Sequence, residues 1–206
     1  MGSLLSRRLG YRFLDTGAMY RALTWRVVSS GIDPSDEAAV SALLSRLRLR
    51  LIWSSAPGEP PHVTIDGKDA SAHLREAAVE AAVSLVSRMP GVREAMVAQQ
   101  RAVAGSGRVI MVGRDIGTVV LPQADLKLYL TASAEERARR RWLEMQAQGR
   151  DGDYQSVLEN LRLRDGIDST RALAPLRPAE DAHIINTDGL DVEQVVEKAL
   201  ALVEAT

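Results

Sequence analysis

The segment Gly113-Arg114-Asp115 places a cation directly beside an anion, and a second glycine, Gly117, follows shortly after. Four apolar residues at 109–112 come before it, and their β-branching predicts a short strand that is buried on both faces. In open α/β sheets, ligands bind just beyond the carboxyl ends of such strands. We therefore predict a loop that binds a polar ligand. A plain strand-to-turn transition with a surface ion pair is the alternative.

A second candidate site begins at Asp15-Thr16-Gly17, between a predicted strand at 11–14 and a predicted helix at 18–30. Thr16 is a plausible N-cap for that helix, whose first N–H groups and positive dipole end favour an anion. Arg21 follows Gly17 by one helical turn on the same face, so its guanidinium would reach the same anion. The alternative for Arg21 is a solvated charge on the helix surface.

Arginine dominates the basic residues, because lysine supplies only three of the 26. Arginine binds phosphate and carboxylate groups bidentately, so this bias suits a phosphate-handling site, although a GC-rich genome would produce it as well. Arg137 and Arg141 lie one turn apart on a predicted helix at 135–148, where a solvated charged face is the alternative.

A polar stretch at 165–171 follows a predicted helix at 154–164. Asp168 and Arg171 place charges of both signs on it, and Arg164 directly precedes it. Its length and composition predict an irregular, mobile cover over a site.

The elements that would hold these residues alternate between strands and helices, which is typical of an α/β fold with a parallel sheet. A separate pair of alternating runs, at 48–54 and 62–66, predicts a small antiparallel excursion. Ser133 is predicted to cap the helix at 135–148. The other strands are expected at 109–112, 125–131 and 183–186, and the other helices at 2–9, 37–47, 74–89, 92–104 and 191–205.

Composition narrows the class of protein. A chain of 206 residues can bury one good core with a small appended subdomain. No apolar run approaches the roughly 18 residues that cross a bilayer, and the first residues lack the apolar segment of a signal peptide. The net charge of −1 argues against a general nucleic-acid binder. Without cysteine there is no disulfide framework and no thiolate metal site, so we expect a cytoplasmic protein.

Three stretches in order carry a family resemblance. They are Phe13-Leu14-Asp15-Thr16-Gly17-Ala18-Met19-Tyr20-Arg21, then Gly113-Arg114-Asp115-Ile116-Gly117-Thr118-Val119-Val120, then Arg164-Asp165 with Asp168-Ser169-Thr170-Arg171 and Ala174-Pro175-Leu176. Together they resemble the bacterial cytidylate kinases, which are nucleoside monophosphate kinases of the P-loop class. The resemblance implies a three-layer α/β fold with a parallel sheet. It implies transfer of a phosphoryl group from ATP to CMP or dCMP with Mg²⁺, by a monomer.

The resemblance also implies a division of the chain. Residues 48–74 would be the β-containing part of the monophosphate-binding insert. Residues 1–47 and 75–206 would form the core kinase domain, with a lid at about 150–175.

The resemblance assigns roles to individual positions. Arg114, Arg164 and Arg171 would act in catalysis, and Arg137 with Arg141 would contact the donor nucleotide. The acceptor would be bound at its phosphate by Arg21, Arg114 and Arg171, at its sugar by Arg164 and Asp168, and at its base by Ser84, Arg93 and Asp115. Thr16 and Gly17 would also bind this substrate.

The base contacts have a chemical rationale. Cytosine presents an N4 amino donor beside an N3 acceptor, so a carboxylate suits the first and an arginine or serine hydroxyl suits the second. Uracil reverses both groups and would set its carbonyl oxygen against Asp115. An unpaired buried polar group costs about 1–3 kcal/mol, which corresponds to a preference of roughly 5- to 150-fold.

One family motif does not occur in the sequence. The P-loop pattern G-x-x-x-x-G-K-[ST] is absent, and the chain begins within what resembles the helix that follows that loop. We expect the first strand and its loop to be encoded upstream, and the two strands flanking that strand to lack a partner here. The alternatives are a truncated, non-catalytic CMP-binding remnant, or a kinase for another nucleoside monophosphate such as UMP.

Overall fold

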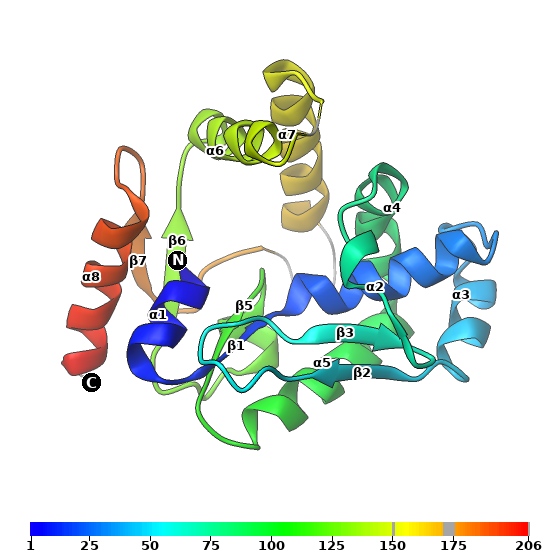
Figure 1. Cartoon of the computed structure of the whole chain (residues 1–206), viewed down its shortest axis with the longest axis horizontal. Helices are drawn as coiled ribbons and strands as arrows, with labels where there is room; N and C mark the ends of the chain where they lie inside the picture. Colours follow the sequence, from blue (N-terminus) through cyan, green and yellow to red (C-terminus); the bar gives the residue numbers. More distant parts are fainter. Residues whose placement is uncertain (150, 171–175, 206) are drawn as a thin grey trace. The chain divides into compact units, whose positions relative to one another are not determined.

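The chain forms two compact units, Met1–Ile116 and Gly117–Thr206 (Figure 1). The computed structural model describes residues 1–149, 151–170 and 176–205, and gives the backbone alone for Arg164, Asp168 and Thr170.

Two parallel strands, β1 (Arg12–Asp15) and β5 (Val109–Val112), hold the predicted site in the first unit. They pair from Arg12 with Val109 to Asp15 with Val112, so both strands end at the same level. The residues that follow each strand therefore emerge side by side. Helix α1 (Gly2–Leu9) contacts both strands, and a Cβ on Gly2 would lie 2.7 Å from the Phe13 ring. Glycine is what permits this close approach.

Helix α2 (Thr16–Ser29) runs through the apolar core of this unit. It follows β1 without a loop and packs mainly on α4 (Ala77–Ser87) (Figure 1). Its core side chains recur at helical spacing and are fully buried: Met19, Leu23 and Val27. The remaining helical elements of the unit are α3 (Glu37–Leu44), the 3₁₀ turn η1 (Ser71–His73) and α5 (Pro90–Ala104).

The predicted antiparallel excursion is confirmed. Strand β2 (Leu49–Ile52) pairs antiparallel with β3 (His62–Ile65), which pairs in turn with the short β4 (Lys68–Asp69). The connection between β2 and β3 contacts α1, where the Ser3 hydroxyl donates to the Gly58 carbonyl at 2.6 Å. Gly58 has a φ of +79° and faces the α1 backbone, so a glycine is needed on both counts.

A second parallel pair, β6 (Leu128–Thr131) with β7 (His183–Asn186), lies in the second unit. Helix α8 (Val192–Glu204) follows β7 and buries an apolar stripe. Helix α6 (Ala134–Ala147) packs on α7 (Tyr154–Thr170) through a small cluster of buried residues made of Ala138, Val157 and Leu158. One turn of π-helix, η2 (Ile116–Val120), directly follows Asp115.

The alternating α/β order and the parallel pairing of the strands are confirmed. The parallel strands occur as two separate pairs, β1–β5 and β6–β7. The predicted cap on α6 is also confirmed, because the Ser133 hydroxyl accepts from the Glu136 N–H at 3.2 Å.

Three local predictions are wrong. Strand β5 is not buried on both faces, since none of its four residues is fully buried and Val112 is 39% exposed. The residue that caps α2 is Asp15, whose carboxylate accepts the Gly17 N–H at 2.9 Å, while Thr16 is already helical. The stretch 165–170 is helical and not irregular, since α7 continues to Thr170. The α6–α7 packing and an ion pair between Arg137 and Asp165 at 2.6 Å favour the longer helix. Smaller differences in length occur in α3, α4 and β6, which are shorter than predicted.

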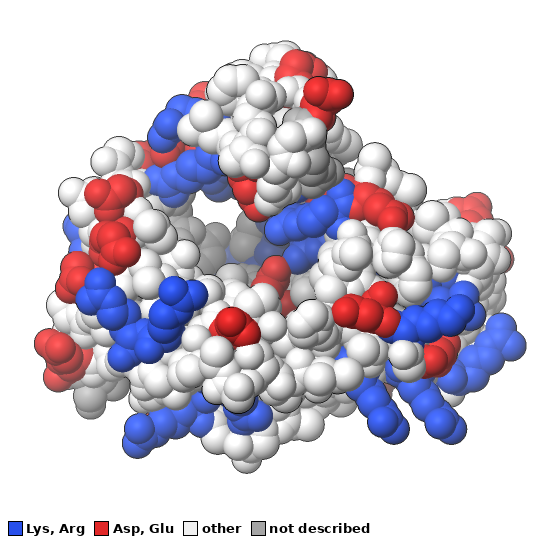
Figure 2. Space-filling model, in the orientation of Figure 1, with Lys and Arg blue, Asp and Glu red and all other residues white. Residues whose placement is uncertain are grey.

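In the described part of the chain, no helix is both long enough and apolar enough to cross a membrane. Acidic and basic side chains both occur across the visible face (Figure 2), in keeping with the near balance of 26 basic and 27 acidic residues.

Candidate active site

The carboxyl ends of β1 and β5 are joined by a side-chain hydrogen bond. The Thr16 hydroxyl donates to the Val112 carbonyl at 3.0 Å, across 96 residues of sequence. Gly113 lies directly against this contact, since a Cβ there would be 2.4 Å from the Thr16 Oγ1 and 2.7 Å from Ile116. The two predicted site segments, 15–17 and 113–115, therefore form one surface at the strand ends, as the parallel fold requires.

Arg21 lies in the second turn of α2, one turn after Gly17 as predicted, and is paired with Asp15 at 2.7 Å. Its side chain is 10% exposed and that of Asp15 is 36% exposed. The Arg21 guanidinium folds back over Gly17, so a Cβ on Gly17 would lie 2.8 Å from Nη1. A guanidinium, a glycine backbone and the first N–H groups of α2 are thus gathered in one place, which is an arrangement suited to an anion.

Arg93 and Asp115 form an ion pair that is almost wholly buried, with side-chain exposures of 8% and 10%. Arg93 comes from the first turn of α5, and Asp115 follows β5 by a short turn. Removing either partner of such a pair would leave a buried charge uncompensated, which is strongly unfavourable. The alternative of a surface ion pair is therefore excluded for Asp115, since its side chain and that of its partner Arg93 are both buried.

Ser84 and Arg114 are the remaining predicted residues of the first unit. Ser84 is buried on α4, and no hydrogen bond between described residues connects its side chain to Arg93 or Asp115. Arg114 is half-buried between Gly113 and Asp115.

Arg137 and Arg141 are the predicted residues of the second unit whose side chains the structure describes, and they have different partners. Arg137 donates to Asp165 at 2.6 Å and to the Ala132 carbonyl at 3.3 Å, whereas Arg141 pairs with Glu144 at 2.7 Å. Arg171 lies outside the described residues, as do the side chains of Arg164 and Asp168.

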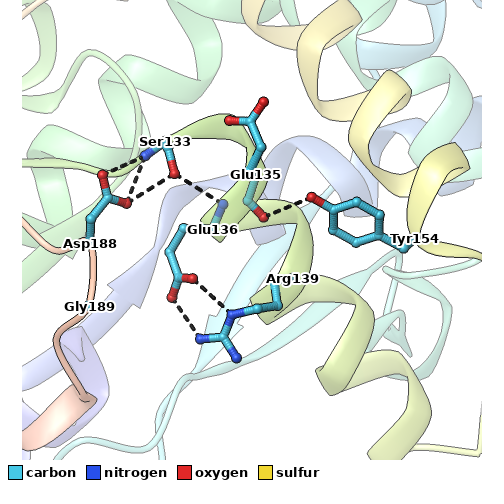
Figure 3. Close-up of a pocket in the computed structure, with 7 residues that line it drawn as sticks. All are labelled: Ser133, Glu135, Glu136, Arg139, Tyr154, Asp188 and Gly189. Carbon is cyan, nitrogen blue, oxygen red and sulfur yellow. Dashed lines mark hydrogen bonds and ion pairs between the residues drawn. The ribbon is translucent and has the colours of Figure 1, made fainter.

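The sequence did not predict a small polar pocket in the second unit (Figure 3), with a cavity volume of about 330 Å³. Ser133 and Asp188 point toward one another there, with the Ser133 N–H donating to Asp188 at 2.9 Å. Hydrogen bonds from Arg139, and then from Arg140, hold the pKa of Glu136 at about 2. The other residues that line the pocket are Glu135, Arg139, Tyr154 and Gly189. Each charged group around this pocket has a protein partner.

Asp15 is the site residue that sequence reasoning quoted in a motif without giving it a role. The sequence does carry a signal for a role of Asp15, because aspartate directly before a helix is a preferred N-cap. Across the described ranges, no group of three or more His, Cys, Asp or Glu side chains is placed to hold a metal ion.

The chain is similar to known proteins over nearly its whole length. A model of the cytidylate kinase family matches residues 1–205. A protein of Nocardia farcinica named cytidylate kinase is 48% identical over 198 residues, which is 94% of this chain and 83% of that protein. Another of the same name from Pelotomaculum thermopropionicum is 47% identical, covering 98% of this chain and 88% of its own length. A third, from Geobacillus kaustophilus, is 48% identical, with coverage of 97% and 88%. This chain belongs to the cytidylate kinase family.

Proposed function

We propose that this protein transfers the terminal phosphoryl group of ATP to CMP or dCMP, giving ADP and the corresponding diphosphate in pyrimidine nucleotide metabolism. The relatives named above are called cytidylate kinase and cover almost the whole chain. One geometric observation supports the proposal. An anion site at Arg21 and the buried Arg93–Asp115 pair lie together at the ends of two parallel strands.

The anion site would hold the phosphate of the acceptor. Phosphoryl transfer requires little covalent help from the protein, but it requires alignment and positive charge around the moving group. Arg21 and the N-terminal N–H groups of α2 supply both, and Arg114 follows the neighbouring strand. Thr16 and Gly17 shape this surface. Arg164 and Arg171 are retained in the proposal as catalytic cations, with Asp168 and Arg164 at the sugar.

The buried pair would read the base. Asp115, which is paired with Arg93, would accept the N4 amino group of cytosine through its carboxylate. Arg93 carries further N–H donors for the ring acceptor, and the Ser84 hydroxyl is the other proposed donor. The pair thereby presents an acceptor and a donor at fixed positions, in the order that cytosine requires and uracil does not.

The donor nucleotide is proposed to contact Arg137 and Arg141. Mg²⁺ would enter as part of the ATP substrate, and no side chain of this chain is assigned to it. The division into a core of 1–47 and 75–206 with a lid at about 150–175, and an insert at 48–74, belongs to the same proposal. So do a monomeric state and a cytoplasmic location.

The test is an assay of ADP release with ATP and each of CMP, dCMP, UMP and AMP, run beside calorimetric titration with the same monophosphates. We expect turnover with CMP and dCMP, and roughly 5- to 150-fold weaker use of UMP. Binding of CMP without ADP release would identify a binding protein and overturn the kinase proposal. Equal use of UMP would overturn the roles given to Arg93 and Asp115.

A further inference from the structure

We infer that Asp15 is a positioning residue for the acceptor phosphate and that it acts through Arg21. This inference rests on the proposed function, since it concerns the same anion site. Asp15 links two features of the site with one carboxylate. Its Oδ1 accepts the Gly17 N–H at 2.9 Å, and its Oδ2 accepts from Arg21 Nη2 at 2.7 Å.

The place that Arg21 occupies is electrostatically unfavourable for a cation. The N-terminus of a helix carries a partial positive charge, and anions are stabilised there while cations are destabilised. Arg21 nevertheless folds back over the first turn of α2, with its side chain only 10% exposed. A carboxylate at the same point offsets the repulsion, and Asp15 is that carboxylate. Without it, the guanidinium is expected to swing away from the helix end toward water.

The geometry around Gly17 supports the same conclusion. Arg21 Nη1 and Nη2 would lie 2.8 and 3.1 Å from a Cβ at this position, and Asp15 Oδ1 would lie 3.0 Å from it. The pair therefore fits over the helix end only because residue 17 has no side chain. Since one Asp15 oxygen serves each partner, the cap and the ion pair can be separated by mutation.

Asp15→Asn separates them. Asparagine caps helices as well as aspartate does, so its amide oxygen can still accept the Gly17 N–H. The substitution removes the negative charge that holds Arg21. We expect a melting temperature within about 2 °C of the wild type and a CMP dissociation constant raised about tenfold, the equivalent of one well-placed charge at a helix end.

Repeating Asp15→Asn in a protein that already carries Arg21→Met distinguishes a positioning role of Asp15 from a purely structural one. In that background Asp15 has no guanidinium to hold and only repels the phosphate. Asp15→Asn should then leave CMP affinity unchanged or improve it. The same tenfold loss in both backgrounds would show that Asp15 acts on the fold alone and would overturn the inference. So would unaltered affinity in the single Asp15→Asn variant.

Inorganic phosphate separates this inference from the proposed function. Titration of the wild type with phosphate, followed by the NMR signals of the Gly17 and Ala18 amides, reports on the anion site without any nucleoside. Phosphate binding that weakens in Asp15→Asn, in a protein that binds no CMP, would uphold the inference and overturn the proposed function. CMP binding that Asp15→Asn does not weaken would uphold CMP as the ligand and overturn the inference. If phosphate leaves both amide signals unmoved and CMP does not bind, both fail.

Discussion

Arg93 and Asp115 are 22 residues apart in sequence, yet they form a buried ion pair between the first turn of α5 and the turn after β5. A pair of this kind is tolerated in an interior only when each charge compensates the other. The geometry of this buried ion pair is therefore set by α5 together with the turn after β5.

The stability of the protein should depend on keeping this pair complete. Asp115→Ala leaves the Arg93 guanidinium buried and unpaired, and we expect a loss of about 3–5 kcal/mol in the free energy of unfolding. The double variant Arg93→Met, Asp115→Leu should recover most of that loss, because it removes both charges at similar volume. Urea denaturation of the wild type, the single variant and the double variant measures this. A double variant as unstable as the single one would contradict the explanation.

The same carboxylate should set the choice of base. Asp115→Ala removes the acceptor for the cytosine amino group, but uracil has no donor at that position to lose. We expect kcat/KM for CMP to fall far more than kcat/KM for UMP, with the ratio changing by roughly 5- to 150-fold. Steady-state kinetics with both acceptors give the ratio, which is insensitive to a general loss of folded enzyme. Equal losses for the two acceptors would remove Asp115 from base recognition.

Gly58 offers a test of how the β2–β3 connection contacts α1. Both Gly58→Ala and Gly31→Ala place a side chain at a positive φ, +79° and +70° respectively, at a cost of about 1–2 kcal/mol. The two sites differ in their surroundings. A Cβ at Gly58 would lie 2.4 Å from the Ser3 carbonyl oxygen, whereas a Cβ at Gly31 would contact nothing within 4 Å.

We expect Gly58→Ala to destabilise the protein by about 1–3 kcal/mol more than Gly31→Ala does, through this additional crowding. Thermal or urea denaturation of the two variants gives the difference. If the two cost the same, the packing of the connection on α1 is looser than the Ser3–Gly58 hydrogen bond indicates.

Glu136 should make the stability of the protein depend on acid pH. Its pKa falls from an ordinary value of 4.5 to about 2 in the folded protein, first because of hydrogen bonds from Arg139 and then from Arg140. A carboxyl with a lowered folded-state pKa stabilises the fold above its unfolded pKa, and loses that contribution as the pH falls toward the folded value. The contribution of Glu136 is thus complete above about pH 4.5 and lost toward pH 2.

The measurement is the melting temperature of the wild type and of Glu136→Gln at several pH values. Glu136→Gln should melt below the wild type near neutral pH, and the gap should close between about pH 4.5 and 2. Added salt should shrink the gap, because the arginine partners are solvent-exposed, at 57% for Arg139 and 38% for Arg140. Glu159→Gln, which removes a surface carboxylate on α7, is the matched control. A gap that does not vary with pH would mean that Glu136 acts through packing and not through its charge.

The sequence was informative wherever structure depends on local pattern. The strands β1, β5 and β7 and the helix α2 follow directly from short apolar runs and helical spacing. The N-cap of α2 was misassigned because Asp15 and Thr16 are both preferred cap residues. A distant contact determines which of the two is the cap, because the Thr16 hydroxyl is hydrogen-bonded to the Val112 carbonyl. No local pattern contains that information.

The C-terminal third of α7 is not predicted by the sequence, for a similar reason. Asp165, Gly166 and Asp168 disfavour a helix on propensity alone. The helix forms there with support from the α6 packing and from the Arg137–Asp165 pair, 28 residues apart. The pairing of Asp115 with Arg93 could not be predicted from the sequence either. The residue types at 93 and 115 suggest what each side chain could bind, but they do not show that the two are buried together.

The contact between Thr16 and Gly113 has a consequence for how this family can vary. The space that a side chain at 113 would need is filled by the Thr16 hydroxyl and by Ile116. A side chain at 113 therefore requires a smaller residue at 16, and that exchange also removes the bond that ties the two strand ends together. Among natural sequences, a residue other than glycine at 113 is therefore expected only where residue 16 is smaller than threonine.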